Sequence, residues 1–404
     1  MKKIGLREFL FLAPVIVLIS IFSLVPVIQS FTYTFFDYRL NDQQNAGLYL
    51  NERFNYELFD ETQLYLTMFL EEDKQQVTDP VLLGKIDTVI AKVEDKAKAF
   101  AGKEGVQKIT KEEKTELIAL SKETQEVVQQ LAEQYDTANE ENLPLIAKDI
   151  ENSIIPANFI GLKGYKQALG DARLGAALVN TTIFTFVSVA FELVLGLALA
   201  MIMNKAMRGK GLIRTTSLIP WAIPTAVAAL MWSYLYDGSS GIVAHLFQMV
   251  GLVDNSRELL LSAGGAMVST ILADVWKTTP YMALLLLAGL QNISKDTYEA
   301  ADIDGASSIQ KFFTITIPLL KPSILVALLF RTLDAFRVFD LIYVLTGGGP
   351  GGATETLSIY GYKAMFAQTN FGYGSVIVMI MFVCVAVIAT IYVKFLGANL
   401  MDKN

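Results

Sequence analysis

Six apolar runs, each long enough to cross a bilayer, constrain this 404-residue chain more than any other feature. A transmembrane helix needs about 20 consecutive apolar residues because the hydrocarbon layer is about 30 Å thick. The runs occupy residues 9–36, 176–203, 218–236, 264–290, 324–345 and 373–395. Charged residues make up only 18% of the chain, whereas soluble domains average about 25%. The sequence therefore predicts an all-α membrane protein with six spans.

A polar insert, residues 37–174, separates the first two runs. It carries 26 Asp and Glu against 16 Lys and Arg, a balance of −10, whereas the rest of the chain has 14 against 17, or +3. Apolar residues recur every three or four positions over 82–100 and again over 117–131, which predicts a hairpin of two amphipathic helices. Thr110 and Glu113 have the spacing of a capping box before the second helix. Residues 54–70 are a candidate third helix.

The distribution of Lys and Arg predicts the orientation. The head holds three, residues 205–214 hold four and residues 291–321 hold three, whereas the opposite set of short loops holds only Arg257 and Lys363. Because basic loops stay in the cytoplasm, both termini are expected there and the insert is expected on the outer face. The first run exceeds the apolar core of a signal peptide, so we expect it to be retained. The predicted parts are a head with span 1 (1–36), the insert (37–174) and a five-span core (175–404).

Several classes of chemistry are excluded by the residue inventory. The chain has one cysteine, Cys384, and one histidine, His245, so it predicts neither a disulfide framework nor a cysteine metal cluster. It contains no Gly-x-x-x-x-Gly-Lys-Ser/Thr phosphate-binding loop. We therefore expect no catalytic site, metal or cofactor in this chain, and any ATP is expected to bind to a partner.

A polar stretch, residues 297–322, lies between the fourth and fifth runs and reads as a helix, a sharp turn and a second helix. Ser294 is placed to cap the first helix, and Ser307 or Ser308 the second. The pair Asp304-Gly305 is a turn signal in which Gly305 is free to adopt a positive φ. The prolines at its end are expected to return the chain to the next span.

This stretch resembles the EAA loop of binding-protein-dependent ABC importer permeases, in the sugar branch that includes the maltose, glycerol-phosphate and trehalose systems. The resemblance covers the six spans but not the insert, and it implies a type I importer permease fold. In that family the loop is a coupling helix that docks on a cytoplasmic ATPase. The residues that carry the motif, and are implied to couple to the ATPase, are Glu299, Ala300, Ala301, Asp304, Gly305 and Ala306. The implied partners are two ATPase subunits that bind ATP and Mg, a second permease and an extracytoplasmic sugar-binding protein.

Charged residues inside the fourth and fifth runs are the candidate substrate pathway. A charge at the centre of a span costs about 2.5–3.5 kcal/mol on insertion scales, so it marks either a pathway or an ion pair between helices. The segments 276–281 and 339–350 also resemble the family's spans on either side of the EAA loop. That resemblance implies a pathway lined by Asp274, Lys277, Thr278, Tyr281, Arg331, Asp334 and Arg337, with Ala335 and Val338 beside them. Because the maltose system has neutral amides at these contacts, the charges here suit either a different sugar or internal pairing.

The basic loop at 208–214 also resembles that family, and we interpret it as a positive-inside anchor. The sequence thus predicts the permease subunit of an ATP-driven sugar importer in a bacterial inner membrane. A secondary transporter is a second possibility, although the chain lacks the repeated halves that such transporters often show. A membrane sensor with an outward helical domain is a third. Six spans without a cytoplasmic signalling domain argue against it.

Overall fold

A computed structural model describes residues 6–205 and 209–401, which form two compact units. The membrane unit contains residues 6–31, 165–368 without 206–208, and 374–401. The insert unit contains residues 32–164 and 369–373. Residues 1–5 of the predicted basic head and Arg208 of the predicted basic loop lie outside the described residues. The predicted boundary at residue 174 falls inside a helix of the membrane unit.

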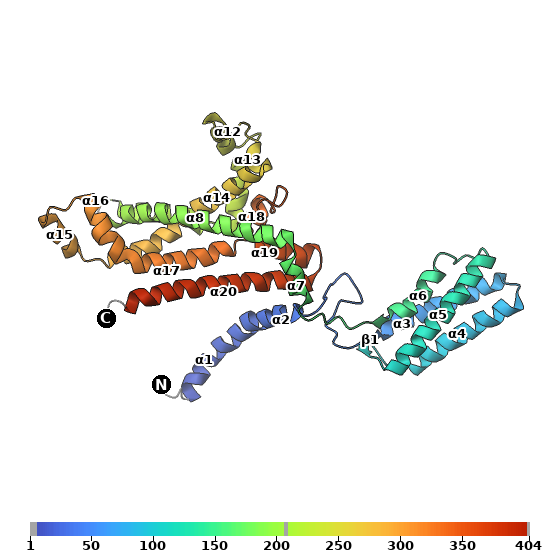
Figure 1. Cartoon of the computed structure of the whole chain (residues 1–404). Helices are drawn as coiled ribbons and strands as arrows, with labels where there is room; N and C mark the ends of the chain where they lie inside the picture. The colour runs from blue at the N-terminus through green and yellow to red at the C-terminus, as the bar shows by residue number, and fades with distance from the viewer. Residues whose placement is uncertain (1–5, 206–208, 402–404) are drawn as a thin grey trace. The chain divides into compact units, whose positions relative to one another are not determined.

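Five helices among the described residues are long and apolar enough to cross a membrane: Phe11–Tyr33, Ala172–Asn204, Ala263–Gln291, Ser308–Phe336 and Phe371–Phe395. They comprise α1 (Leu6–Ile19), the π-helix η1 (Ser20–Leu24) and α2 (Val25–Tyr33), then α8 (Ala172–Asn204), α14 (Ala263–Gln291), α16 (Ser308–Lys311), the π-helix η3 (Phe312–Thr316), α17 (Ile317–Phe336) and α20 (Phe371–Met401). Figure 1 shows α8 lying along α14 and α17, which pack against it. Four of the predicted apolar runs are thus confirmed as helices, and the remaining membrane-length helix overlaps the predicted run 324–345.

The third apolar run is not one helix, so the predicted count of six spans is not confirmed. It is divided into α10 (Ile219–Ala222) and α11 (Thr225–Leu235), after α9 (Lys210–Ser217). Pro224 explains the break, because it lacks an N–H and forces the preceding Ile223 into an extended conformation, ψ 133°. With 11 residues, α11 is too short to span a bilayer alone.

The fifth run is shifted relative to its prediction. Its helix begins at Ser308 instead of Ile324 and ends at Phe336, and α18 (Asp340–Leu345) follows as a separate helix. Pro318 lies inside the helix Ser308–Phe336, directly after the π-helix η3, so it does not turn the chain as predicted. Arg337 is the C-cap residue of α17, directly after its last helical residue.

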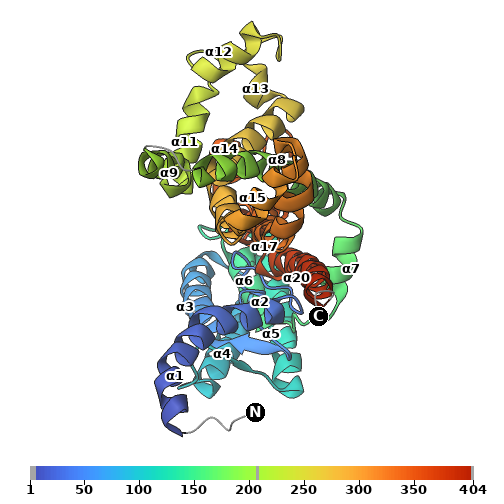
Figure 2. The ribbon, with the colours of Figure 1, turned by 90° about the vertical axis from the view of Figure 1, so that its left-hand side faces the viewer.

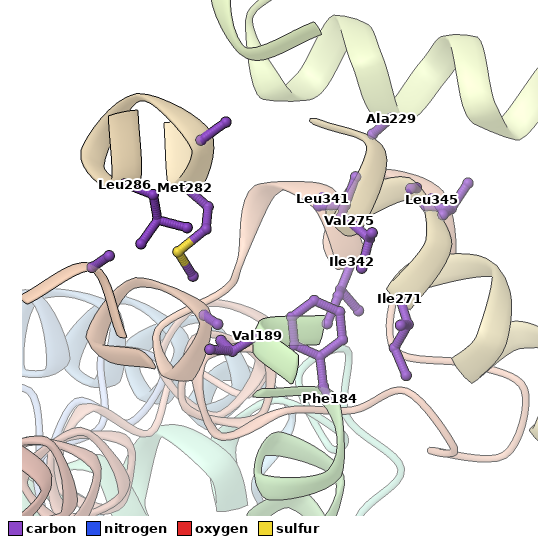
Figure 3. Packing of buried hydrophobic residues seen from close by; sticks show 14 of the residues in the cluster. Phe184, Val189, Ala229, Ile271, Val275, Met282, Leu286, Leu341, Ile342 and Leu345 are labelled. Atoms are coloured by element: carbon purple, nitrogen blue, oxygen red, sulfur yellow. The ribbon is translucent and has the colours of Figure 1, made fainter. Parts of the chain in front are cut away.

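Shorter helices complete the membrane unit: α7 (Lys163–Leu169), α12 (Ile242–Met249), α13 (Glu258–Leu261), α19 (Leu357–Tyr362) and the π-helix η4 (Lys363–Ala367). The chain leaves α11 for α12 and α13, which lead it back to α14 (Figure 2). The hydrophobic core lies between α8, α14, α17 and α18. Figure 3 shows Phe184 and Val189 of α8 beside Met282 of α14 and Ile342 of α18. The helices approach closely at Gly196, where a Cβ atom would lie 2.7 Å from Met282 Cγ.

The insert unit is a bundle of four helices with a small sheet (Figure 1). Its elements are β1 (Arg53–Asn55), α3 (Tyr56–Asp73), the 3₁₀-helix η2 (Lys74–Gln76), α4 (Pro80–Ala99), β2 (Val106–Lys108), α5 (Lys111–Gln134), α6 (Leu143–Asn152) and β3 (Ile154–Ile155). The strands are antiparallel in the order β2-β1-β3, and Arg53 lies opposite both Lys108 and Ile155. The predicted hairpin is α4 and α5, and the candidate third helix is α3. Neither α6 nor the sheet was predicted.

Periodic burial explains why these helices form. The apolar stripes predicted in α4 and α5 face the core, with Ile86, Val89 and Leu117 fully buried. The predicted capping box is present, since Thr110 Oγ1 accepts a bond from Glu113 N and the Glu113 carboxylate accepts one from Thr110 N.

Candidate functional site

A buried cluster of charges joins three of the long helices of the membrane unit. Arg331 of α17 is 1% exposed. Its Nη2 donates to Glu192 Oε1 of α8 at 2.7 Å and to Asp274 Oδ2 of α14 at 3.1 Å, and its Nη1 donates to Asp334 Oδ2 at 2.7 Å. The structure thus brings together three of the predicted pathway residues, and the guanidinium links α8, α14 and α17.

Glu192 was missed by the sequence analysis. It is fully buried, and its carboxylate also accepts a hydrogen bond of 2.7 Å from Thr278 Oγ1. The same hydroxyl lies 2.6 Å from the carbonyl oxygen of Asp274. Glu192 is the only charged residue in the apolar run 176–203. The rule that singled out charges in the fourth and fifth runs would have found it there as well.

Lys277 does not pair with a carboxylate. Its ammonium donates to the carbonyl oxygens of Ile223, at 2.7 Å, and Trp221, at 3.3 Å. These carbonyls lie at the break between α10 and α11, where Pro224 leaves them without helical partners. Lys277 therefore supplies the hydrogen bonds that these two carbonyl oxygens would otherwise lack. Tyr281 stacks on Trp221, with ring centroids 5.5 Å apart and planes at 14°, and it does not line the cavity described next.

A cavity of about 190 Å³ opens beside the charge cluster. Its walls are formed by Thr225, Asp274, Lys277, Thr278, Arg331, Asp334, Ala335, Arg337, Val338, Phe339, Asp340 and Leu341. The side chains of Asp334 and Arg337 are 63% and 58% exposed, and their charged groups are 4.0 Å apart. Arg337 also donates through Nε to the carbonyl of Leu333 at 3.0 Å. On one side of the cavity the buried charges of Arg331 and Asp274 are paired with each other. At its rim the opposite charges of Asp334 and Arg337 are accessible.

The helix–turn–helix that follows α14 has the predicted shape, and its second helix, α16, is the first turn of the membrane-length helix Ser308–Phe336. It consists of α15 (Lys295–Ile303) and α16, and Ser294 caps α15 by accepting a bond from the backbone N–H of Asp296. Gly305 adopts φ 76°, its N–H bonds to the carbonyl of Asp302, and the next N–H bonds to the carbonyl of Ala301. This pair of bonds is a Schellman motif, which requires a left-handed residue at the position of Gly305.

This helix–turn–helix lies on the surface of the membrane unit. No residue of α15 or α16 is buried. Among the predicted coupling residues, Glu299, Ala300, Asp304 and Gly305 are exposed, and Ala301 and Ala306 are partly buried. Large apolar side chains are also exposed here, with Ile303 at 88% and Ile309 at 72%. These side chains are available for contact with another protein.

Comparisons with known proteins agree with this architecture. The family model for the binding-protein-dependent transport system inner membrane component matches residues 192–401, just over half of the chain. The trehalose/maltose transport system permease protein of Thermococcus litoralis is 45% identical over 236 residues, which is 58% of this chain and 79% of that protein. The trehalose transport system permease protein of Mycobacterium tuberculosis is 47% identical over 240 residues, 59% of this chain and 76% of that protein.

A solved structure shares the fold of the membrane part. It is the crystal structure of a bacterial ABC transporter involved in the import of the acidic polysaccharide alginate, with a TM-score of 0.54 at 22% identity. The match covers 59% of this chain and 84% of that chain. Together with the membrane-length helices, these matches show that the chain belongs to the family of binding-protein-dependent transport system inner membrane components and is a multi-pass membrane protein.

Proposed function

We propose that this chain is the permease subunit of an ATP-driven importer for a disaccharide or oligosaccharide. The observation that carries the proposal is the exposed helix–turn–helix of α15 and α16, which links α14 to the membrane-length helix Ser308–Phe336 and has exposed apolar side chains. Two relatives are named as permease proteins of trehalose/maltose and trehalose transport systems, and these names support a disaccharide as the substrate.

In this proposal the helix–turn–helix docks on a cytoplasmic ATPase. ATP and Mg bind to a pair of ATPase subunits, and an extracytoplasmic sugar-binding protein and a second permease complete the importer. ATP favours one arrangement of the ATPase pair, and its differential affinity for the two states drives the change of access. Both termini then lie in the cytoplasm. The coupling contacts are assigned to Glu299, Ala300, Ala301, Asp304, Gly305 and Ala306.

The charge cluster takes two roles in the substrate pathway. Arg331, Glu192 and Asp274 satisfy one another, so we assign them to holding the three helices in register. Asp334 and Arg337 retain exposed charged groups at the cavity rim and are assigned to contact with sugar hydroxyls. Charged side chains that are already oriented by neighbours lose little side-chain entropy when they bind a ligand.

A glycine pair tests the coupling role. Gly305 and Gly251 both have positive φ, 76° and 75°, and neither would place a Cβ atom against a neighbour. Gly305→Asp therefore perturbs the turn and adds a charge at the docking face, and Gly251→Asp makes the same change in a loop outside α15 and α16. We expect Gly305→Asp to abolish uptake of radiolabelled trehalose or maltose with normal membrane insertion, and Gly251→Asp to retain it. Normal uptake by Gly305→Asp would contradict the coupling role.

Co-purification tests the assembly. The wild-type chain, extracted from native membranes in mild detergent, is expected to retain an ATPase and a second permease, identified by mass spectrometry. The Gly305→Asp variant is expected to lose the ATPase but keep the permease. A wild-type chain that purifies alone and monodisperse would instead favour a secondary transporter or a sensor.

A further inference from the structure

Four aromatic side chains form a row that leads away from the cavity beside the charge cluster. Phe339, the N-cap residue of α18, forms part of the cavity wall. Its ring stacks on Tyr343, one turn further along α18, with ring centroids 5.1 Å apart and planes at 17°. The centroid of Tyr362 lies 5.2 Å from that of Tyr343 and 5.0 Å from that of Phe339. Phe366 follows, 5.0 Å from Tyr362. We call these four residues the aromatic row.

The row lies at the end of the membrane unit that is opposite the helix–turn–helix. Figure 1 shows α18 and α19 beyond the end of α17 that lies away from α15. Tyr362 is the last residue of α19, and Phe366 belongs to η4. In the proposed importer α15 faces the cytoplasm, so the opposite end faces outward. The row then connects the outer face of the membrane unit with the cavity.

The hydrophobic core does not account for the row. α18 buries Leu341, Ile342 and Leu345 in the core, whereas Tyr343 of the same helix is 43% exposed and Phe366 is 59% exposed. The two remaining rings, those of Phe339 and Tyr362, are half-buried. Part of each ring is therefore available to a ligand.

Polar groups accompany these rings. Asp340 is exposed and lines the cavity together with Asp334 and Arg337, and the two tyrosines add hydroxyl groups that can donate or accept. A pyranose ring matches this combination. Its C–H groups form an apolar face with slightly positive hydrogens, which suits the negative face of an aromatic ring. Its hydroxyl groups project from the ring edge and suit carboxylate, guanidinium and phenol groups.

We propose that the aromatic row binds the pyranose rings of the substrate and leads them from the outer face to the cavity. The class of ligand, a disaccharide or oligosaccharide, rests on the proposed function. Successive centroids are 5.1, 5.2 and 5.0 Å apart, so a sugar can contact the next aromatic ring before it leaves the previous one. Contacts of this kind are individually weak, which allows the sugar to move along the row.

An aromatic belt in contact with lipid headgroups is the main alternative. Tyr and Trp gather at membrane surfaces because their rings are apolar and their tips are polar. A belt does not explain why the first member of the row, Phe339, lines a polar cavity beside Asp334 and Arg337. Two of the four members are phenylalanines, which lack a polar tip. These observations favour a sugar as the ligand.

Saturation-transfer NMR on the purified full chain tests the proposal. The chain is placed in lipid nanodiscs, because the headgroup of a maltoside detergent is itself a maltose unit. Irradiation of the aromatic protons is expected to saturate ring C–H protons of added trehalose and maltose. Sorbitol, which has hydroxyl groups but no ring, is expected to receive no saturation. The dependence of the signal on sugar concentration gives the Kd.

Tyr343→Leu removes one ring but keeps an apolar side chain, and it is expected to raise the Kd about two- to tenfold. Tyr343→Phe removes only the hydroxyl and is expected to keep most of the affinity. The matched control Phe382→Leu removes a ring of α20 that is 52% exposed, and it is expected to bind as wild type does. Phe366→Leu, a change at an exposed side chain, covers the possibility that Tyr343→Leu does not fold.

The proposal is overturned if wild type shows no transfer to either sugar, or if a folded leucine variant of the row binds both sugars with wild-type affinity. The first result would favour a lipid belt, and the second would place the sugar on other aromatic residues. The measurement requires neither an ATPase nor a binding protein. Its failure beside the expected behaviour of the Gly305 and Gly251 variants would therefore remove the row and leave the importer. Sugar binding by a chain that purifies alone would do the reverse.

Discussion

Replacing Arg331 by methionine tests whether the buried charge cluster is a structural unit. Arg331 makes four hydrogen bonds to carboxylates while being 1% exposed. Methionine retains a long, flexible, apolar side chain, so the main change is the loss of the positive charge. Glu192 and Asp274 would then be buried with no cation between them.

The expected cost follows from the burial of each partner. Removing one member of a buried ion pair destabilises proteins by about 3–5 kcal/mol, because a charge is left uncompensated. Asp334 adds little, since its side chain is 63% exposed and exposed pairs contribute about 0–1 kcal/mol. A buried cluster replaced as a whole by neutral groups is often nearly neutral in stability. The triple variant Arg331→Met, Glu192→Gln, Asp274→Asn should therefore recover most of the loss caused by the single change.

Sodium dodecyl sulfate titration in mixed micelles, followed by tryptophan fluorescence, measures the free energy of unfolding of both variants. Asp334→Asn serves as the control for an exposed member of the cluster and should change it by less than about 1 kcal/mol. The reasoning is refuted if Arg331→Met is destabilised by less than about 1 kcal/mol, or if the triple variant is no more stable than the single one.

Three further changes test the packing and charge of both units. Gly289→Leu should destabilise the membrane unit by about 1–3 kcal/mol, measured by the same titration, because a Cβ there would lie 2.3 Å from a serine of α17. Thr110→Ala should cost about 1 kcal/mol and lower the thermal midpoint of the insert unit, because it removes the capping box. Burial raises the pKa of Glu355, but hydrogen bonds from Arg173 and Lys363 more than offset burial and hold its pKa below the usual range. Its stabilising contribution should therefore be present above the unfolded pKa of about 4.3 and be lost as pH falls through the lower folded pKa. Thermal midpoints against pH should show a larger acid-side loss in wild type than in Glu355→Gln, which keeps the loss that comes from other carboxyl groups with lowered pKa values, such as Glu113.

Periodicity predicted the long helices of the insert unit well, because one face of each is buried over several turns. The 24 residues of α5 give a repeated signal, and its N-terminus carries a capping box. The strands β1–β3 have only two or three residues each, too few for an alternating pattern to be recognised. α6 has ten residues and begins beside Pro144, which can be read either as a helix start or as a chain break.

Part of the candidate site could also be predicted. A charge in an apolar run is visible without a structure, so Asp274, Arg331 and Asp334 were found, and Glu192 was available by the same rule. The partners of Lys277 were not predictable in this way. They are backbone carbonyls of another segment, and only the tertiary fold brings them to the ammonium.

The break in the third run and the polar cavity are structurally linked through Lys277. Non-helical backbone at membrane depth is tolerated where protein buries it or where it lines a polar cavity. Here Lys277 satisfies the carbonyls that Pro224 leaves free, and Thr225, the first residue after the break, lines the cavity beside Asp274 and Arg331. A continuous helix would have satisfied those carbonyls itself and left Lys277 as an unpaired charge. Apolar composition alone cannot detect the break between α10 and α11. That break provides the carbonyl partners that stabilise Lys277 at the wall of the proposed pathway.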